Sequence, residues 1–235
     1  MLIKNRISLV GKIVFLFIYS CRDPKEKINL VPLATDTLTS VESISPETIG
    51  VSSTIINRVA WQKPNFIIEK LGRDLKGKVI ADIGAGPTGF FSMLLAKQGA
   101  QVLAIDIDPA ALRYIEKEKI SLDSTQQHLI KTRLARVDDP RLHKEEIDGI
   151  LIVNTMAYLG NKPVYLQNLK NNLKPGGKIV IVDFKMKRLP AQIAPPKNER
   201  IYEDLVEEYL YQAGFKNITL DDQTLNYQYI ITAEK

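Results

Sequence analysis

The stretch from Val79 to Asp106, VIADIGAGPTGFFSMLLAKQGAQVLAID, decides the fold. It opens with a short apolar run, typical of a buried strand, which ends in a glycine-rich loop at residues 84–89. Residues 90–97 then carry apolar and small side chains at helical spacing, and Gly99 ends this predicted helix. A second apolar run follows and ends at Asp106. Strand, glycine loop, helix, strand and terminal acid predict a βαβ unit that holds a nucleoside-like ligand.

Two classes of ligand fit this unit. In the first, Gly84, Gly86 and Gly89 cradle the pyrophosphate of a dinucleotide, and Asp106 binds a ribose. Asp82, two residues before the loop, argues against this class, because a carboxylate gains nothing beside a pyrophosphate. A ligand with a positive sulfonium and an amino group, and no phosphate, is compatible with that charge. The residues therefore favour S-adenosylmethionine, with NAD and an NAD-dependent oxidoreductase as the alternative.

The sequence resembles the class I S-adenosylmethionine-dependent methyltransferases. The resemblance rests on the loop DIGAGPTG and on LKPGG followed by KIVIVDF, and it extends over the predicted domain. In that family a DxGxGxG loop holds the methionine part of the donor, and an acid at the end of the second strand binds the ribose hydroxyls. Pro87 stands as a one-residue insertion relative to that pattern. The resemblance assigns donor binding to residues in and beside this loop: Asp82, Gly84, Ala85, Gly86, Asp106 and Ile107.

The chain beyond this unit continues to alternate predicted strands and helices. Strands are predicted at 129–135, 147–153, 178–184, 215–220 and 225–232. Helices are predicted at 54–71, with a break at Pro64, and at 109–120, 163–173 and 199–213. A polar connection is predicted at 121–127 and a tight turn at 174–177. With the family resemblance, this order implies an α/β fold. The expected architecture is a Rossmann-like, doubly wound, seven-stranded, mostly parallel sheet with a C-terminal antiparallel hairpin.

Further candidate residues follow the predicted strands, at the edge where ligands sit in open α/β sheets. In the family, an acid after the third strand takes the adenine amino group. The resemblance assigns that role to Asp138, with Asp139 as the second choice unless it forms a turn with the following proline. Asn154 and Tyr158 lie in the loop after the next strand, where they would face the transferred methyl group. We expect both to orient the substrate as catalytic candidates, and Asn154 to contact the donor.

The composition of the sequence limits the kinds of metal, nucleic acid or substrate that the protein is expected to bind. Methyl transfer from a sulfonium requires alignment and a dry site rather than a metal, and the two histidines and single cysteine form no cluster that indicates one. The formal net charge is +5, and without Lys4, Arg6 and Lys12 it is 5 − 3 = +2, so nothing indicates a nucleic-acid partner. The expected partner is a methyl acceptor, either a small molecule or a protein. A domain that binds S-adenosylmethionine without turnover is the third hypothesis.

Two segments near the predicted site carry further polar or aromatic side chains. Trp61 and Lys63 precede the first strand. In one interpretation both residues line a segment that covers the donor. In the other, Trp61 packs in the core and Lys63 faces solvent. The loop at 185–198 includes Lys187 and Arg188 among its basic residues. We interpret it as a solvated loop, with reception of an acidic substrate as the alternative.

The N-terminus has the proportions of a signal peptide, with a basic start and the short apolar core IVFLFI at 13–18. The sequence IYSC that ends at Cys21 resembles the lipobox of bacterial lipoproteins, in which the cysteine is acylated. Residues after it are rich in Thr, Ser and Pro without a sustained period. We therefore expect a signal peptide at 1–20, a flexible tether at 21–50 and a methyltransferase domain at 51–235.

The lipobox also predicts a location. A lipidated Cys21 would anchor the protein in a membrane of the bacterial cell envelope, facing the periplasm. S-adenosylmethionine is made in the cytoplasm, however, so an N-terminus that stays inside the cell, with a cytoplasmic domain, is the alternative.

Overall fold

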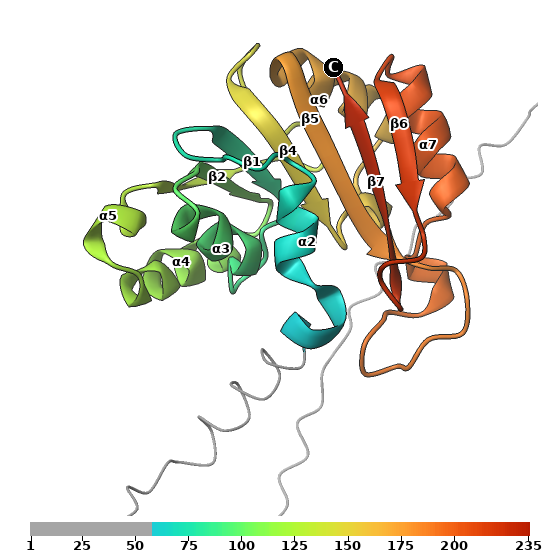
Figure 1. Cartoon of the computed structure of the whole chain (residues 1–235), viewed down its shortest axis with the longest axis horizontal. Coiled ribbons are helices and arrows are strands. Elements are labelled where there is room, and N and C mark those ends of the chain that lie inside the picture. Colours follow the sequence, from blue (N-terminus) through green and yellow to red (C-terminus); the bar gives the residue numbers. More distant parts are fainter. Residues whose placement is uncertain (1–57) are drawn as a thin grey trace, which may run out of the picture. The chain divides into compact units, whose positions relative to one another are not determined.

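The computed structural model describes residues 58–235. The predicted signal peptide at 1–20, Cys21 and the tether at 21–50 lie outside the described residues. The described chain forms a seven-stranded sheet in the order β3-β2-β1-β4-β5-β7-β6 (Figure 1). Neighbouring strands pair in parallel, except that β7 runs antiparallel to both β5 and β6. The predicted Rossmann-like sheet with a C-terminal antiparallel hairpin is confirmed.

The elements have the following bounds. The strands are β1 (Val79–Ile83), β2 (Gln101–Asp106), β3 (Ile130–Leu134), β4 (Ile147–Val153), β5 (Leu173–Phe184), β6 (Lys216–Asp221) and β7 (Gln228–Glu234). The helices are α2 (Pro64–Glu69), α3 (Phe90–Lys97), α4 (Pro109–Glu118), α5 (Ser124–Gln127), α6 (Lys162–Asn172) and α7 (Glu203–Gln212). Short 3-10 turns are η1 (Lys119–Ser121), η2 (Met156–Tyr158) and η3 (Lys197–Glu199). Residues 58–62 are also helical and precede α2.

Helices cover both faces of the sheet, as a doubly wound fold requires (Figure 1). Along β1, Ile80 belongs to the apolar cluster with α2, α3 and α4, whereas Ala81 and Ile83 belong to the cluster with α6 and α7. Strands β4 and β5 alternate between the same two clusters. Because both faces of these strands are buried, their sequences read as nearly continuous apolar runs.

Two helices, α2 and α4, begin at the proline and the capping aspartate from which the sequence predicts a helix break and a helix start. Lys63 adopts a left-handed conformation with φ 49°, and Pro64 opens α2, so the helix predicted at 54–71 is broken at this proline. Asp108 caps α4, because its side chain accepts a hydrogen bond from the Ala110 N–H at 2.7 Å.

Two elements near the C-terminus, α7 and β7, begin later than the sequence predicts. In each case a side chain forms hydrogen bonds with backbone groups of the segment that precedes the element. Helix α7 begins at Glu203 rather than at 199, because the preceding segment is extended at Arg200, whose side chain donates to loop carbonyls. Strand β7 begins at Gln228 rather than at 225. The carboxylate of Asp221 accepts from the Thr224 N–H at 2.9 Å and closes a turn before the strand.

Two connections also differ from the sequence-based expectation. The predicted turn at 174–177 belongs to β5 as a bulge, in which the sheet register shifts and Gly176 has φ 75°. The predicted polar connection at 121–127 contains α5, whose N-terminus is capped by Asp123 through the Gln126 N–H at 3.0 Å. Neither correction moves the strands that end at the predicted site.

The glycine loop is held in place by a close approach of backbone to side chain. A Cβ atom added at Gly84 would lie 2.3 Å from Oγ1 of Thr155, and Gly84 has φ +73°. The N–H groups of Gly84 and Ala85 both donate to the carbonyl of Ile105, at 2.8 and 3.1 Å. Glycine at 84 therefore lets the loop after β1 pack against both β2 and the loop after β4.

Two carboxyl groups are buried near the ends of the central strands. Asp82 in β1 and Asp183 in β5 are each 3% exposed. Burial raises the pKa of Asp82 to about 6, partly opposed by a hydrogen bond from Ser92 and by the charge of Arg58. Burial likewise raises the pKa of Asp183 to about 6, opposed by backbone N–H donors such as that of Phe184.

We expect Gly84→Ala to destabilise the protein by about 3 kcal/mol, from the left-handed backbone and the clash with Thr155 together. Gly176→Ala is the matched control, because its φ is +75° and nothing lies within 4 Å of the added Cβ. Its cost is expected to be about 1 kcal/mol, the backbone contribution alone. Urea denaturation of both variants measures the difference, and equal costs would contradict the close approach.

The raised pKa of Asp82 predicts a pH-dependent stability difference. An acid whose folded-state pKa exceeds its unfolded value stabilises the fold below the unfolded pKa, and that contribution is lost as pH rises through the folded pKa. Asp82→Asn should therefore gain about 2–3 kcal/mol relative to the parent between pH 4 and pH 7. Denaturation at each pH measures this gain, with Asp108→Asn at the surface as the control. A pH-independent difference would refute the assignment.

Candidate functional site

The carboxyl ends of the central strands meet at one cavity of about 260 Å³. Its walls come from the ends of β1, β2 and β3, from the loop after β4 and from α6. The lining residues are Ile83, Gly84, Ile105, Asp106, Ile107, Ala135, Arg136, Val137, Thr155, Tyr158, Leu159 and Tyr165. This is the place where open α/β sheets bind ligands, and the sequence predicts it from the βαβ unit. We call it the donor cavity.

Asp106 contributes a carboxylate to the wall of the donor cavity, and Gly86 holds it from the adjoining glycine loop. The Gly86 N–H donates to Oδ2 of Asp106 at 2.9 Å, and the Asp108 N–H donates to Oδ1 at 2.9 Å. These bonds fix the carboxylate at the tip of β2 and leave it further lone pairs for a ligand hydroxyl. Gly86 has φ +66° and faces open space, since no atom lies within 4 Å of an added Cβ. A ligand can therefore approach the backbone there.

The opposite walls are apolar and exposed. Ile107 is 57% exposed, Val137 53% and Tyr158 56%, although large apolar side chains usually avoid water. All three line the donor cavity. An apolar cleft with one fixed carboxylate suits a nucleoside, whose base needs flat contact and whose ribose donates hydrogen bonds.

Asp82 lies behind the glycine loop and does not line the donor cavity. Ser92 donates to its Oδ2 at 2.7 Å. Arg58 attracts it electrostatically, and the Arg58 guanidinium sits 4.4 Å from the centroid of the Phe90 ring. Burial lowers the pKa of Arg58, although the charge of Asp82 opposes that shift. The charge of Arg58 therefore partly compensates the buried Asp82 carboxylate.

Asn154 joins a chain of buried amides. Its Oδ1 accepts from Nε2 of Gln228, the Gln228 Oε1 accepts from Nε2 of Gln62 at 3.0 Å, and the Gln62 Oε1 accepts from Nε of Arg58 at 2.7 Å. Gln62 and Gln228 are fully buried. The chain ties the helical residues 58–62 to the loop after β4. The sequence offered no signal for it, because the partners are far apart along the chain.

The two catalytic candidates lie at the same edge but in different settings. Tyr158 lines the donor cavity, and its hydroxyl donates to Glu199 at 3.3 Å. Burial and the charge of Glu199 raise the pKa of Tyr158. Asn154 has φ 56° and, with its amide engaged by Gln228, is not among the lining residues. Their catalytic role stays a prediction.

The segment after β3 that carries Asp138 and Asp139 borders the donor cavity. Arg136 and Val137 line the donor cavity, whereas Asp138 is exposed on the adjoining turn. Asp139 accepts from the Arg141 N–H at 2.7 Å and so serves that turn. Ala85 contributes its backbone to the loop while its side chain packs in the core. The role of Asp138 toward adenine stays a prediction.

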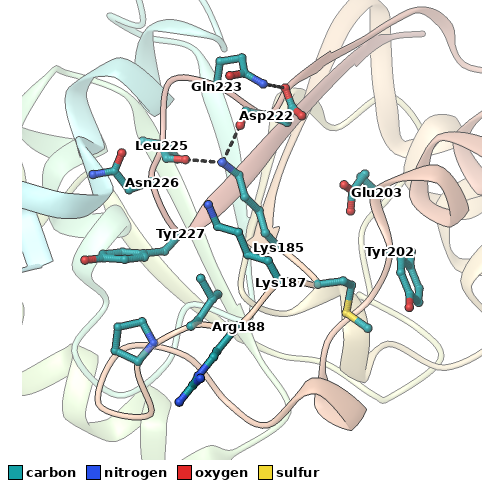
Figure 2. Close-up of a pocket in the computed structure, with 13 residues that line it drawn as sticks. Lys185, Lys187, Arg188, Tyr202, Glu203, Asp222, Gln223, Leu225, Asn226 and Tyr227 are labelled. Atoms are coloured by element: carbon teal, nitrogen blue, oxygen red, sulfur yellow. Dashed lines mark hydrogen bonds between the residues drawn. The ribbon is translucent and has the colours of Figure 1, made fainter.

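A second, larger cavity of about 850 Å³ opens where the loop after β5 faces the β6–β7 connection (Figure 2). We call it the basic cavity, since Lys185, Lys187 and Arg188 line it. Within residues 58–235, no group of three or more His, Cys, Asp or Glu side chains is arranged to hold a metal ion. None of the helices in that range combines the length and hydropathy of a membrane span.

Comparison with known proteins agrees with this geometry. Residues 74–229 match the family model of a methyltransferase domain. A demethylmenaquinone methyltransferase of Tropheryma whipplei (strain Twist) is 32% identical over 112 residues, which cover 48% of this chain and 44% of that protein. Phosphoethanolamine N-methyltransferase 1 of Zea mays is 27% identical over 175 residues, 71% of this chain and 34% of that protein. The chain thus spans less than half the length of these two relatives.

Solved structures share the fold. A SAM-dependent methyltransferase from Aquifex aeolicus superposes with a TM-score of 0.66 at 22% identity, covering 82% of this chain and 99% of that chain. The family model covers about two thirds of the sequence, including the glycine loop, Asp106 and the loop after β4. The chain belongs to the methyltransferase domain family, with the fold of its S-adenosylmethionine-dependent members.

Proposed function

We propose that the protein is an S-adenosylmethionine-dependent methyltransferase whose donor occupies the donor cavity. The observation that carries the proposal is the Asp106 carboxylate, held by the Gly86 N–H beside an open glycine and an exposed apolar wall. In this placement the ribose hydroxyls donate to Asp106. The adenine lies between Ile107 and Val137, and the methionine part passes along Gly86.

The charged end of the donor would extend beyond the donor cavity along the glycine loop, behind which Asp82 lies with Arg58 as its electrostatic partner. The methionine part carries an amino group, a carboxylate and a sulfonium, so a carboxylate and a guanidinium close to each other match its charges. Arg58 then pairs with the donor carboxylate, while Asp82 offsets the positive groups. Because Arg58 compensates Asp82, that acid alone does not exclude a dinucleotide. The methyltransferase family model weighs against the NAD alternative.

A lone pair of the acceptor attacks the methyl carbon of the donor, the C–S bond breaks, and its electron pair leaves on the sulfur of S-adenosylhomocysteine. The protein then needs to align the acceptor and exclude water. Asn154 and Tyr158 stand at the strand ends where this alignment takes place. Relatives are named for demethylmenaquinone and phosphoethanolamine, so we propose a small-molecule acceptor.

We also propose that the chain is a lipoprotein, cleaved before Cys21 and anchored in the cell envelope. The support is the sequence pattern alone: a basic start, a short apolar core and IYSC. Acyl chains contribute roughly 0.8 kcal/mol per buried methylene, so a multiply acylated Cys21 would hold the domain at a membrane.

Asp106→Asn and Asp106→Ala are expected to weaken S-adenosylmethionine binding at least tenfold, since each removes a charged acceptor for the ribose hydroxyls. Isothermal titration calorimetry measures the affinity. Asp108→Ala is the matched control, because Asp108 caps α4 and does not line the donor cavity. Affinity within twofold of the parent in a folded Asp106 variant would remove the ribose assignment.

Formation of S-adenosylhomocysteine with a small-molecule cell extract, followed by mass spectrometry, separates an enzyme from a non-catalytic binding domain.

Cys21→Ala is expected to move the protein from the membrane fraction to the soluble fraction of its host cells, because the variant lacks the acylated thiol. Cell fractionation with intact-mass analysis measures both location and lipid. Cys21 is the only cysteine, so an acyl mass on the parent chain reports this site directly. A variant that stays membrane-bound would exclude lipidation as the anchor.

A further inference from the structure

We propose that the basic cavity binds the methyl acceptor through an anionic group, a phosphate or a carboxylate, held at Lys187 beside Lys185. That the bound anion is the methyl acceptor rests on the proposed methyltransferase function, whereas anion binding itself does not depend on it. Lys187 and Arg188 are exposed, as expected of a solvated loop, and they also line this cavity.

The basic cavity is large enough for a metabolite. Its volume of about 850 Å³ falls in the range of roughly 300–1,000 Å³ typical of small-molecule sites. Its walls are the loop after β5, the start of α7 and the connection between β6 and β7 (Figure 2). The lining residues include Lys185, Lys187, Arg188, Tyr202, Glu203 and Tyr227.

The two lysines differ in their partners. Nζ of Lys185 donates to the backbone carbonyls of Asp222 and Leu225, so neutral groups hold it. Lys187 points into the cavity (Figure 2) and, within residues 58–235, its ammonium has no hydrogen bond and no ion pair. Burial and the charge of Lys187 lower the pKa of Lys185, although the charges of Asp222, Asp221 and Glu203 oppose that shift. Two like charges close together are relieved by an anion.

Acids in the cavity offset the charge of this pair only in part, because Asp222 and Glu203 attract Lys185 electrostatically. Glu203 and Asp222 line it too, but neither forms an ion pair with a lysine of the described chain. The Asp222 carboxylate accepts from Nε2 of Gln223 at 2.7 Å instead. Glu203 keeps one buried oxygen without a hydrogen-bond partner in the described residues. The lysine side of the cavity therefore remains available for an anion.

The loop that presents Lys187 is fixed by an arginine. Nη1 of Arg200 donates to the carbonyls of Lys185 and Lys187, each at 3.0 Å, and Nε donates to the carbonyl of Pro195 at 2.7 Å. These bonds hold the backbone on both sides of Met186. A ligand that binds there does not have to order the loop first, which favours affinity.

Aromatic contacts connect the basic cavity to the strand ends. Trp61 packs against Phe184, the last residue of β5, at 6.3 Å between ring centroids, and against Tyr227 at 5.8 Å. Lys185 directly follows Phe184, and Gln228, which bonds Asn154, directly follows Tyr227. The cavity thus opens at the same sheet edge as the donor cavity, as a methyl acceptor requires.

Phenyl phosphate is the probe for a soluble acceptor, and the fluorescence of Trp61, the only tryptophan of the chain, is the readout. We expect a saturable change when it is titrated into the full chain, with and without S-adenosylhomocysteine. Lys187→Glu should weaken binding at least tenfold and Lys187→Gln at least threefold. Lys197→Glu is the matched control, since it changes the same charge on an exposed residue of the same loop outside the cavity, and should stay within twofold.

Phosphatidylcholine vesicles with and without phosphatidic acid test a lipid headgroup as the source of the phosphate. Binding of phenyl phosphate points to a soluble acceptor, and binding of phosphatidic acid vesicles alone points to a lipid. Either supports the proposal if Lys187→Glu weakens it and Lys197→Glu does not. Equal effects of both variants, or no saturable binding of either probe, overturn it. S-adenosylhomocysteine affinity, measured in the same samples, separately tests the proposed function.

Discussion

The site depends on one steric constraint, the contact between the loop after β1 and the loop after β4. Gly84 approaches Thr155 so closely that no side chain fits, and its N–H donates to the carbonyl of Ile105. Three neighbouring strands are thereby joined at their carboxyl ends. Asp106 meets the Gly86 N–H because the loop is held in this position. The donor cavity is the space that this packing leaves.

A second constraint places the helical residues 58–62 over that edge. Buried amides must find partners, and the chain from Arg58 through Gln62 and Gln228 to Asn154 satisfies each of them. Loss of one partner leaves the next buried and unpaired, so the hydrogen-bonded chain specifies one arrangement of residues 58–62. The same helical turn carries Trp61, which touches β5 and the β6–β7 connection. Residues 58–62 line neither cavity, but Trp61 packs against Tyr227, which lines the basic cavity.

Charge is distributed unevenly along this edge. Behind the glycine loop, Asp82 and Arg58 offset each other, which suits a donor that carries charges of both signs. At the far end of β5, Lys185 and Lys187 repel each other, and no carboxylate in the described chain pairs with them. The balanced pair behind the glycine loop fits a donor with charges of both signs, and the lysines of the basic cavity fit an anionic acceptor.

The sequence by itself determined most strands and the donor loop, and the resemblance to the methyltransferase family implied how the strands are arranged in one sheet. Glycine conformation, apolar periodicity and helix caps act within a few residues, so the βαβ unit, Gly86 and Asp106 were predictable. Only the tertiary structure decided the charge partner of Asp82, the amide chain to Asn154 and the basic cavity at Lys187. These arise between segments as far apart as Gln62 and Gln228, 166 residues along the chain. Such contacts cannot be predicted from residues close together in the sequence, because they form only when the strands and loops pack.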